Sequence, residues 1–155
     1  MDSWFNTPER VQRLNEAAQT WLGTPFAANS RCKGKQGGVS CQMLAEQVYK
    51  ESGVPFSFLV PSGSMRWAGV SSDSLIVQFL ETHPELIALV SDPSPEVVQA
   101  GDLLGFKIGK CVHHVGVALS EDKFIHCMRG SSALICSLSD PTYKHRLACI
   151  WRIKP

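Results

Sequence analysis

The spacing of apolar residues changes character partway along the chain, and this change most constrains the fold. The first half has apolar residues at helical intervals, whereas the part after Gly101-Asp102 holds five short apolar or β-branched runs separated by turns. These runs predict strands at 103–108, 112–119, 123–128, 133–138 and 147–153. Helices followed by closely spaced strands predict an α+β fold, with N-terminal helices packed on a mainly antiparallel sheet of five to six strands.

Two segments of the first half carry helix signals. Thr7 can cap a helix that begins with Pro8, and one apolar stripe follows before Gly23 ends the segment; its members are Val11, Leu14, Ala18, Trp21 and Leu22. Ser40 can cap a second helix, which has Cys41 in its first turn and Gly53 at its end. The Gly-rich stretch 23–39 is predicted to be a loop beside a site, 55–74 to be irregular, and 75–80 to be a short helix.

Length and charge narrow the class of protein. A chain of 155 residues with 44% hydrophobic residues can bury one core, so we expect a single domain over residues 1–155. The net charge of +1 and the scattered basic residues predict no nucleic-acid partner, and no apolar run approaches the ~20 residues of a membrane span. Residues 1–10 do not resemble a secretory signal, so we expect synthesis into the cytoplasm and six mostly reduced cysteines.

Cys41 is the candidate nucleophile. A thiol attacks carbonyl groups as the thiolate, and the positive end of a helix dipole beside Cys41 is expected to lower the pKa of that thiol. The competing interpretation is a buried core cysteine, because free cysteine is among the most buried residue types and Cys41 also lies on the apolar stripe of its helix.

A histidine pair supplies the candidate base. His114 and His126 lie in two consecutive predicted strands, and their separation of 12 residues is even. If the hairpin is symmetric about Ser120 with a three-residue loop, the two side chains lie directly opposite one another on the same face. His126 would then orient His114, which is the arrangement of a nucleophile, base and orienting group.

The alternation of strand side chains between the two faces of the sheet also predicts a competing metal site. His113 would point to the other face together with Cys111 and Cys127, and these three could bind zinc if Cys136 or Cys149 supplied a fourth ligand. No pair among them has the spacing Cys-x-x-Cys, so we expect no metal and no other cofactor.

Several segments, taken in order, resemble the NlpC/P60 family of cysteine peptidases. Gly23-Thr24-Pro25-Phe26 is similar to the family's Gly-Thr-Pro-Tyr loop, and Ser40-Cys41-Gln42 stands at its Asp-Cys-Ser nucleophile motif. Gly101-Asp102-Leu103 resembles its Gly-Asp-Leu turn, His114-Val115-Gly116-Val117 its catalytic strand, and Phe124-Ile125-His126 the strand with its third residue. The resemblance implies a papain-like fold and a triad of Cys41, His114 and His126.

The resemblance also implies a substrate and a setting. It implies hydrolysis of an amide bond in the peptide of bacterial peptidoglycan, with Phe26, Ser40 and Gln42 at the positions that bind substrate. Because these three differ from the family's Tyr, Asp and Ser, recognition of a free peptide amine is expected to change. The chain's ending, 143–152, resembles the compact branch found in phage tails and gene-transfer particles, which implies particle proteins as partners and a particle-associated location.

Two alternatives to this hydrolase remain open. An acyltransferase would use the same cysteine and histidine but pass the acyl group to an amine. A structural or binding module of a phage tail would keep the fold with little catalysis, and the altered residues around Cys41 favour it.

Overall fold

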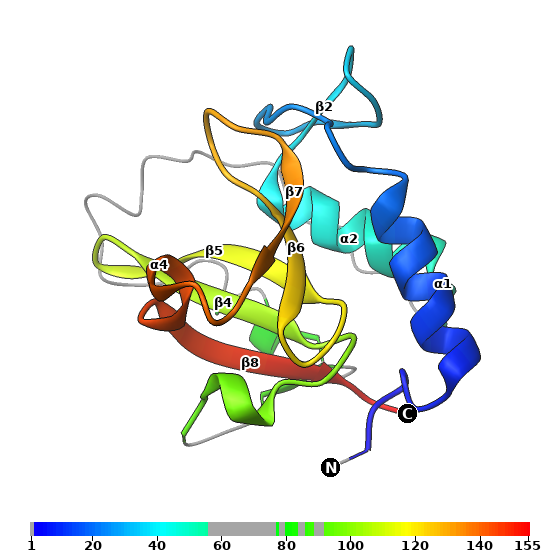
Figure 1. Cartoon of the computed structure of the whole chain (residues 1–155), viewed down its shortest axis with the longest axis vertical. Helices are drawn as coiled ribbons and strands as arrows, with labels where there is room; N and C mark the ends of the chain where they lie inside the picture. Colours follow the sequence, from blue (N-terminus) through cyan, green and yellow to red (C-terminus); the bar gives the residue numbers. More distant parts are fainter. Residues whose placement is uncertain (1, 56–76, 78–79, 84–85, 89–91) are drawn as a thin grey trace.

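The computed structural model describes residues 2–55, 77, 80–83, 86–88 and 92–155, and it contains a six-stranded antiparallel sheet (Figure 1). The strands run in the order β3-β8-β4-β5-β6-β7. Their bounds are β3 Leu86–Ala88, β4 Leu103–Ile108, β5 Cys111–Ala118, β6 Lys123–Cys127, β7 Ala133–Ser137 and β8 Leu147–Ile153. The C-terminal strand β8 therefore lies inside the sheet, between β3 and β4.

Helix α2 packs against β5 and β6 on one face of this sheet, and α1 packs beside α2 (Figure 1). Helix α1, Pro8–Gln19, is capped by Thr7, whose hydroxyl accepts from the backbone N–H of Arg10, as predicted. Helix α2, Cys41–Glu51, is capped by Ser40, whose hydroxyl accepts from Met43 N–H. The apolar stripe predicted for α1 runs past the end of the helix, because α1 ends at Gln19 and Leu22 is 39% exposed.

The sheet is covered on both faces. The helices and one face share the larger apolar cluster, to which Cys41, Val115, Val117 and Cys127 belong. The other face carries a smaller cluster around Leu104, Phe106, Phe124 and Ile150, and Tyr143 packs against it. Tyr143 comes from the short helix α4, Pro141–Lys144, which links β7 to β8.

The turn before β4 is tied to the central strand β8. Gly101 has φ of +89°, and a Cβ there would lie 1.9 Å from Phe5 Cδ2, so only glycine fits. Asp102 is fully buried and accepts two hydrogen bonds from the Arg152 guanidinium, at 2.8 and 2.9 Å. Arg152 also donates to the carbonyl oxygen of Val97, the last residue of the 3-10 helix η2, Pro95–Val97. The Gly101-Asp102 turn is thus held both by the ion pair of Asp102 with Arg152 and by the close packing of Phe5 against Gly101.

The predicted α+β fold and all five predicted strands are confirmed, with bounds that differ by at most one residue at either end. Three short strands were missed: β3, and the hairpin of β1, Arg31–Cys32, and β2, Gly38–Val39, inside the predicted loop 23–39. Strands of two or three residues are too short to show periodicity. The predicted irregular span 55–74 and short helix 75–80 fall largely outside the described residues. Among the described helices, none has the length and apolar character of a membrane span.

Candidate active site

Cys41 is the first residue of α2 and is 2% exposed. The β1–β2 hairpin leads directly into it, and Ser40 fixes the turn by capping the helix. The backbone N–H groups of Val115 in β5, of Gln42 and of Cys41 itself act on the Cys41 sulfur and favour its ionised form, which lowers the pKa of the thiol. The start of α2 is therefore held against the residue that follows His114.

This arrangement is possible because the regular pairing of β5 with β6 ends at Val117. In the β5–β6 ladder, Val117 pairs with Ile125 and Ala118 with Phe124. The β6–β7 ladder extends further, as far as the pair of Cys127 and Ala133. Since the β5–β6 ladder starts at Val117, the N–H of Val115 is available to act on the Cys41 sulfur. Where the pairing ends, Cys41, which belongs to the helix-covered face, lies next to β5, the strand that carries His114.

His114 and His126 are in direct contact beyond the end of the β5–β6 ladder. His114 Nε2 lies 2.8 Å from His126 Nδ1, and the side chains are 4% and 1% exposed. Both rings lie among the aromatic residues of the smaller cluster, with Phe106 5.8 Å from His114 and Phe124 4.8 Å from His126 between ring centroids. The predicted pairing of these two histidines on one face is thus observed.

The predicted register of the hairpin is wrong by two residues. The turn is centred on Glu121 instead of Ser120, because the Ser120 hydroxyl accepts from the backbone N–H of Lys123 at 3.1 Å and so begins the loop. His114 and His126 are consequently diagonal neighbours and not directly opposite. A shift of two residues keeps every side chain on its face, whereas a shift of one would have separated the pair.

The alternative zinc site finds no support in the described residues. No three His, Cys, Asp or Glu side chains among them lie close enough together to hold a metal ion. The alternation assumed for Cys111 and His113 is interrupted, since Phe106 pairs with His114 and Lys107 with Val112, which leaves a bulge at His113. All six cysteines are free thiols.

Burial controls the ionisation of the site. It raises the pKa of the Cys41 thiol to about 11, although the three backbone N–H donors act in the opposite direction. Burial also lowers the pKa of His114 to about 3, with smaller contributions from His126 and His113, and that of His126 to about 4. The predicted lowering of the Cys41 pKa is therefore wrong, because desolvation outweighs the helix start. At neutral pH the thiol and both imidazoles are uncharged.

The three residues predicted to bind substrate lie at the entrance to α2. Ser40 and Gln42 flank Cys41, and Phe26 forms a bridge with Val39, the residue before Ser40. Ser40 is buried with its hydroxyl oxygen committed to the helix cap, whereas Phe26 and Gln42 are half-buried. The structure therefore brings these three residues together around Cys41.

Two neighbours of His126 were not predicted as site residues. His126 Nε2 lies 3.2 Å from Cys136 Sγ in β7, and Cys136 Sγ lies 3.9 Å from the Tyr143 hydroxyl oxygen. The alternation used for His114 and His126 also places Cys136 on the face of His126, because Phe124 pairs with Cys136. That signal was available in the sequence, whereas the return of Tyr143 over the sheet was not.

Comparison with known proteins agrees with this architecture. The model of the NlpC/P60 family matches residues 23–152. A probable endopeptidase of Haemophilus influenzae is 22% identical over 146 residues, 93% of this chain and 73% of that protein. The murein DD-endopeptidase MepS/murein LD-carboxypeptidase of Escherichia coli K12 is 33% identical over 49 residues, 32% of this chain and 26% of that protein.

Solved structures agree on the fold. A lipoprotein-like NLP/P60 family protein of Staphylococcus aureus superposes with a TM-score of 0.63 at 20% identity, over 100% of this chain and 45% of that chain. The NlpC/P60 domain of the peptidoglycan hydrolase SagA gives a TM-score of 0.55 at 18% identity, over 94% of this chain and 98% of that domain. This chain thus spans less than half of the staphylococcal protein.

Helices on one face of an antiparallel sheet, with a cysteine at a helix start, define the papain-like class of α+β fold that the sequence predicts. Within that class, the chain belongs to the NlpC/P60 family. The prediction of a peptidase agrees with the relatives, two of which are named as endopeptidases.

Proposed function

We propose that this protein is a cysteine hydrolase that cleaves an amide bond in the peptide of bacterial peptidoglycan. The observation that carries the proposal is the His114–His126 contact of 2.8 Å, beside Val115, whose backbone N–H favours the ionised form of the Cys41 thiol. The family membership and the names of the relatives, which include a murein DD-endopeptidase and a peptidoglycan hydrolase, support the choice of substrate.

In the proposed reaction, His114 acts as the general base and His126 orients it. His114 uses Nε2 to contact His126, so Nδ1 is the nitrogen that takes the proton from the Cys41 thiol. The sulfur attacks the scissile carbonyl carbon, the amine leaves with that proton, and water hydrolyses the resulting thioester. The Cys41 backbone N–H, at the helix start, donates to the developing oxyanion, an effect of about 10²–10³ in rate for one donor.

The neutral resting pair fits this order of events. With the pKa of Cys41 raised and that of His114 lowered, the thiol keeps its proton until a carbonyl group is in place. Proton transfer and attack then occur together, and the backbone donors around the sulfur stabilise the charge that develops.

Phe26, Ser40 and Gln42 differ from the Tyr, Asp and Ser of the family. These differences support a substrate that has no free amine near these three residues. Ser40 stands where the family has a carboxylate, and a neutral hydroxyl lacks the opposite charge that attracts an ammonium group. The nearest buried carboxylate on α2, Glu46, already forms an ion pair with Arg31 of β1. The protein should therefore prefer wall peptides whose terminal amine is substituted.

The test is digestion of purified muropeptides, read by mass spectrometry. The wild-type protein should release peptide fragments, Cys41→Ala should lose all turnover while it remains folded, and Cys127→Ala should retain activity as the matched buried-thiol control. Cleavage by Cys41→Ala would end the assignment. Folded wild-type protein without turnover would favour the tail module, and diversion of product to hydroxylamine would favour the acyltransferase.

The resemblance of residues 143–152 to the particle-borne branch extends the proposal to delivery of the enzyme by a phage tail or a similar particle. None of the relatives reported above is named as a particle protein, so this setting stays a prediction. Co-purification with such a particle is its direct test.

A further inference from the structure

We propose that Cys136 and Tyr143 are positioning residues, which set the tautomer of His126 and thereby hold His114 with Nδ1 directed to the thiol. This inference rests on the proposed function, because it assigns His114 the role of base. It extends the site from three residues to five, and four of these side chains, from His114 to Tyr143, form a connected row that ends at α4.

The contacts form one continuous row. From His114 the row passes to His126 at 2.8 Å, to Cys136 at 3.2 Å and to the Tyr143 hydroxyl at 3.9 Å. The Tyr143 ring also packs against His126, with centroids 5.0 Å apart and planes at 82°. His126 is therefore fixed at both ring nitrogens and on its side, which leaves its orientation little freedom.

The proton directions along this row are mutually consistent. For Nδ1 of neutral His114 to accept a proton, its Nε2 must carry hydrogen and donate to His126 Nδ1. His126 then carries its hydrogen on Nε2 and donates to the sulfur of Cys136. The Cys136 thiol in turn donates to the Tyr143 oxygen, in the direction that the geometry gives.

Cys136 is chemically suited to this middle position. A thiol can accept one hydrogen bond and donate another, whereas a thiolate could only accept. Burial is the largest influence on Cys136 and raises the pKa of its thiol, so the proton needed for the bond to Tyr143 stays in place at neutral pH. An aliphatic residue at this position would fill the space but leave His126 Nε2 without that acceptor.

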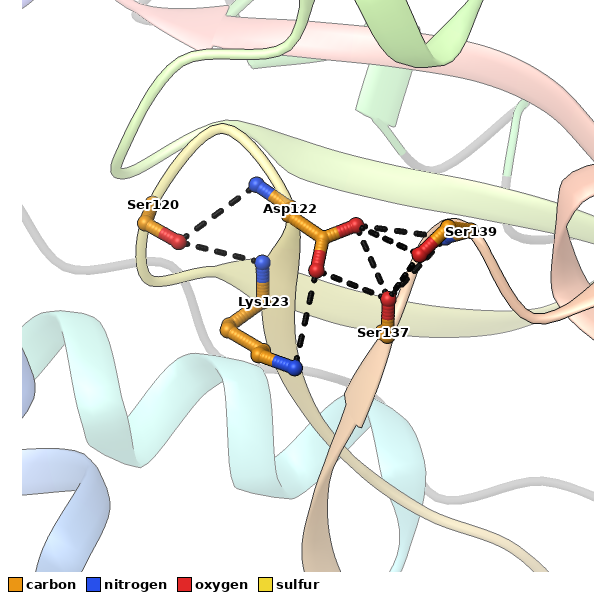
Figure 2. A network of polar contacts seen from close by, with 5 residues as sticks. All are labelled: Ser120, Asp122, Lys123, Ser137 and Ser139. Atoms are coloured by element: carbon orange, nitrogen blue, oxygen red, sulfur yellow. Dashed lines mark hydrogen bonds and ion pairs between the residues drawn. The ribbon is translucent and has the colours of Figure 1, made fainter.

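A separate polar network fixes the strand end that precedes Tyr143 (Figure 2). Asp122 accepts from the Ser137 hydroxyl at 2.7 and 2.8 Å and from the Ser139 backbone N–H at 3.2 Å. Asp140 then caps α4 by accepting from Thr142 N–H at 2.9 Å. The loop between β7 and α4 is thereby tied to the β5–β6 turn, which places Cys136 and Tyr143 relative to His126.

The experiment is nitrogen-15 NMR of the histidine side chains, which distinguishes hydrogen on Nδ1 from hydrogen on Nε2 without any substrate. Wild-type protein should show His126 with hydrogen on Nε2. Cys136→Val, close in volume, should move His126 towards the other tautomer, and Cys136→Ser, which keeps a donor and an acceptor, should restore the wild-type pattern. Tyr143→Phe keeps the ring and should give a smaller shift in the same direction.

The second readout is the rate at which iodoacetamide alkylates Cys41, measured by mass spectrometry at neutral pH. The rate should fall about fivefold in Cys136→Val, the equivalent of one hydrogen bond, and recover in Cys136→Ser. An unchanged His126 tautomer and an unchanged Cys41 rate in Cys136→Val would overturn the inference. Neither readout requires wall cleavage, so failure of the proposed substrate would be distinguishable from failure of this row.

Discussion

Gly116 in β5 lies directly beneath His126 in β6. A Cβ built on Gly116 would come within 3.3 Å of His126 Cβ, 2.9 Å of Phe124 Cδ2 and 3.0 Å of the Ile125 carbonyl oxygen. The close approach of the two strands at Gly116, just beyond the last paired residues, therefore depends on the absence of a side chain there, and the contact between the histidines depends on it too.

Gly116→Ala is the first prediction. The added methyl group must push β6 away, which should lower the free energy of unfolding by about 1–3 kcal/mol and reduce turnover by separating His126 from His114. Urea denaturation and muropeptide digestion measure the two effects. Gly105→Ala is the matched control, because its Cβ would meet Trp151 at 2.7 Å on the helix-covered face of the sheet, opposite to the face of the two histidines. It should destabilise similarly while turnover per folded molecule stays the same.

The pH dependence of Cys41 alkylation gives the second prediction. Because burial raises the pKa of this thiol to about 11, its reaction with iodoacetamide should be slow at pH 6 and should rise steadily through pH 9. Site-resolved mass spectrometry follows the rate. A plateau that is already reached at pH 6 would contradict the neutral resting pair and would indicate a thiolate–imidazolium pair.

Acid should destabilise the protein through its histidine pair. Burial lowers the pKa of His114 and His126 to about 3 and about 4, so the unfolded chain binds more protons than the folded protein below pH about 6.5. Stability should be fully present above that pH and should fall by about 1.4 kcal/mol per pH unit for each extra proton bound. Urea midpoints between pH 7 and 4 test this. In the variant His114→Gln/His126→Gln, the free energy of unfolding should decline less steeply with falling pH. An equal decline would show that the histidine pair is not the cause.

The buried ion pair of Asp102 and Arg152 gives the fourth prediction. Asp102→Asn should cost about 3–5 kcal/mol, because it leaves the charge of a 3% exposed Arg152 uncompensated. Lys33→Gln breaks the more exposed ion pair with Glu51 and should cost less than about 1 kcal/mol. Urea denaturation of both variants gives the comparison, and equal costs would show that burial of the Asp102 pair is not decisive.

The sequence was sufficient where local chemistry decides structure. Thr7 and Ser40 identified both helix starts, and the runs after Gly101 identified the strands, because caps and apolar runs act over a few residues. The pairing of His114 with His126 was also predictable, since the face of a strand residue depends only on whether its position is odd or even. An error of two residues in the turn left that result unchanged.

What the sequence did not reveal depends on packing. The direction of the Cys41 pKa follows from how completely α2 and β5 exclude water, which a helix signal does not report. The participation of Tyr143 required knowledge that α4 folds back over Phe124 and His126. The point at which the β5–β6 pairing ends depends on which residues β6 shares with β7, a choice made by the whole sheet.

The place of β8 inside the sheet gives the strand β4 two neighbours that are far apart in the chain. It pairs with β5 on one side and with β8 on the other. The segment between β5 and β8, which carries His126, Cys136 and Tyr143, is therefore a loop held at both ends by one strand. A substitution that loosens β4 is expected to free both ends of this loop at once.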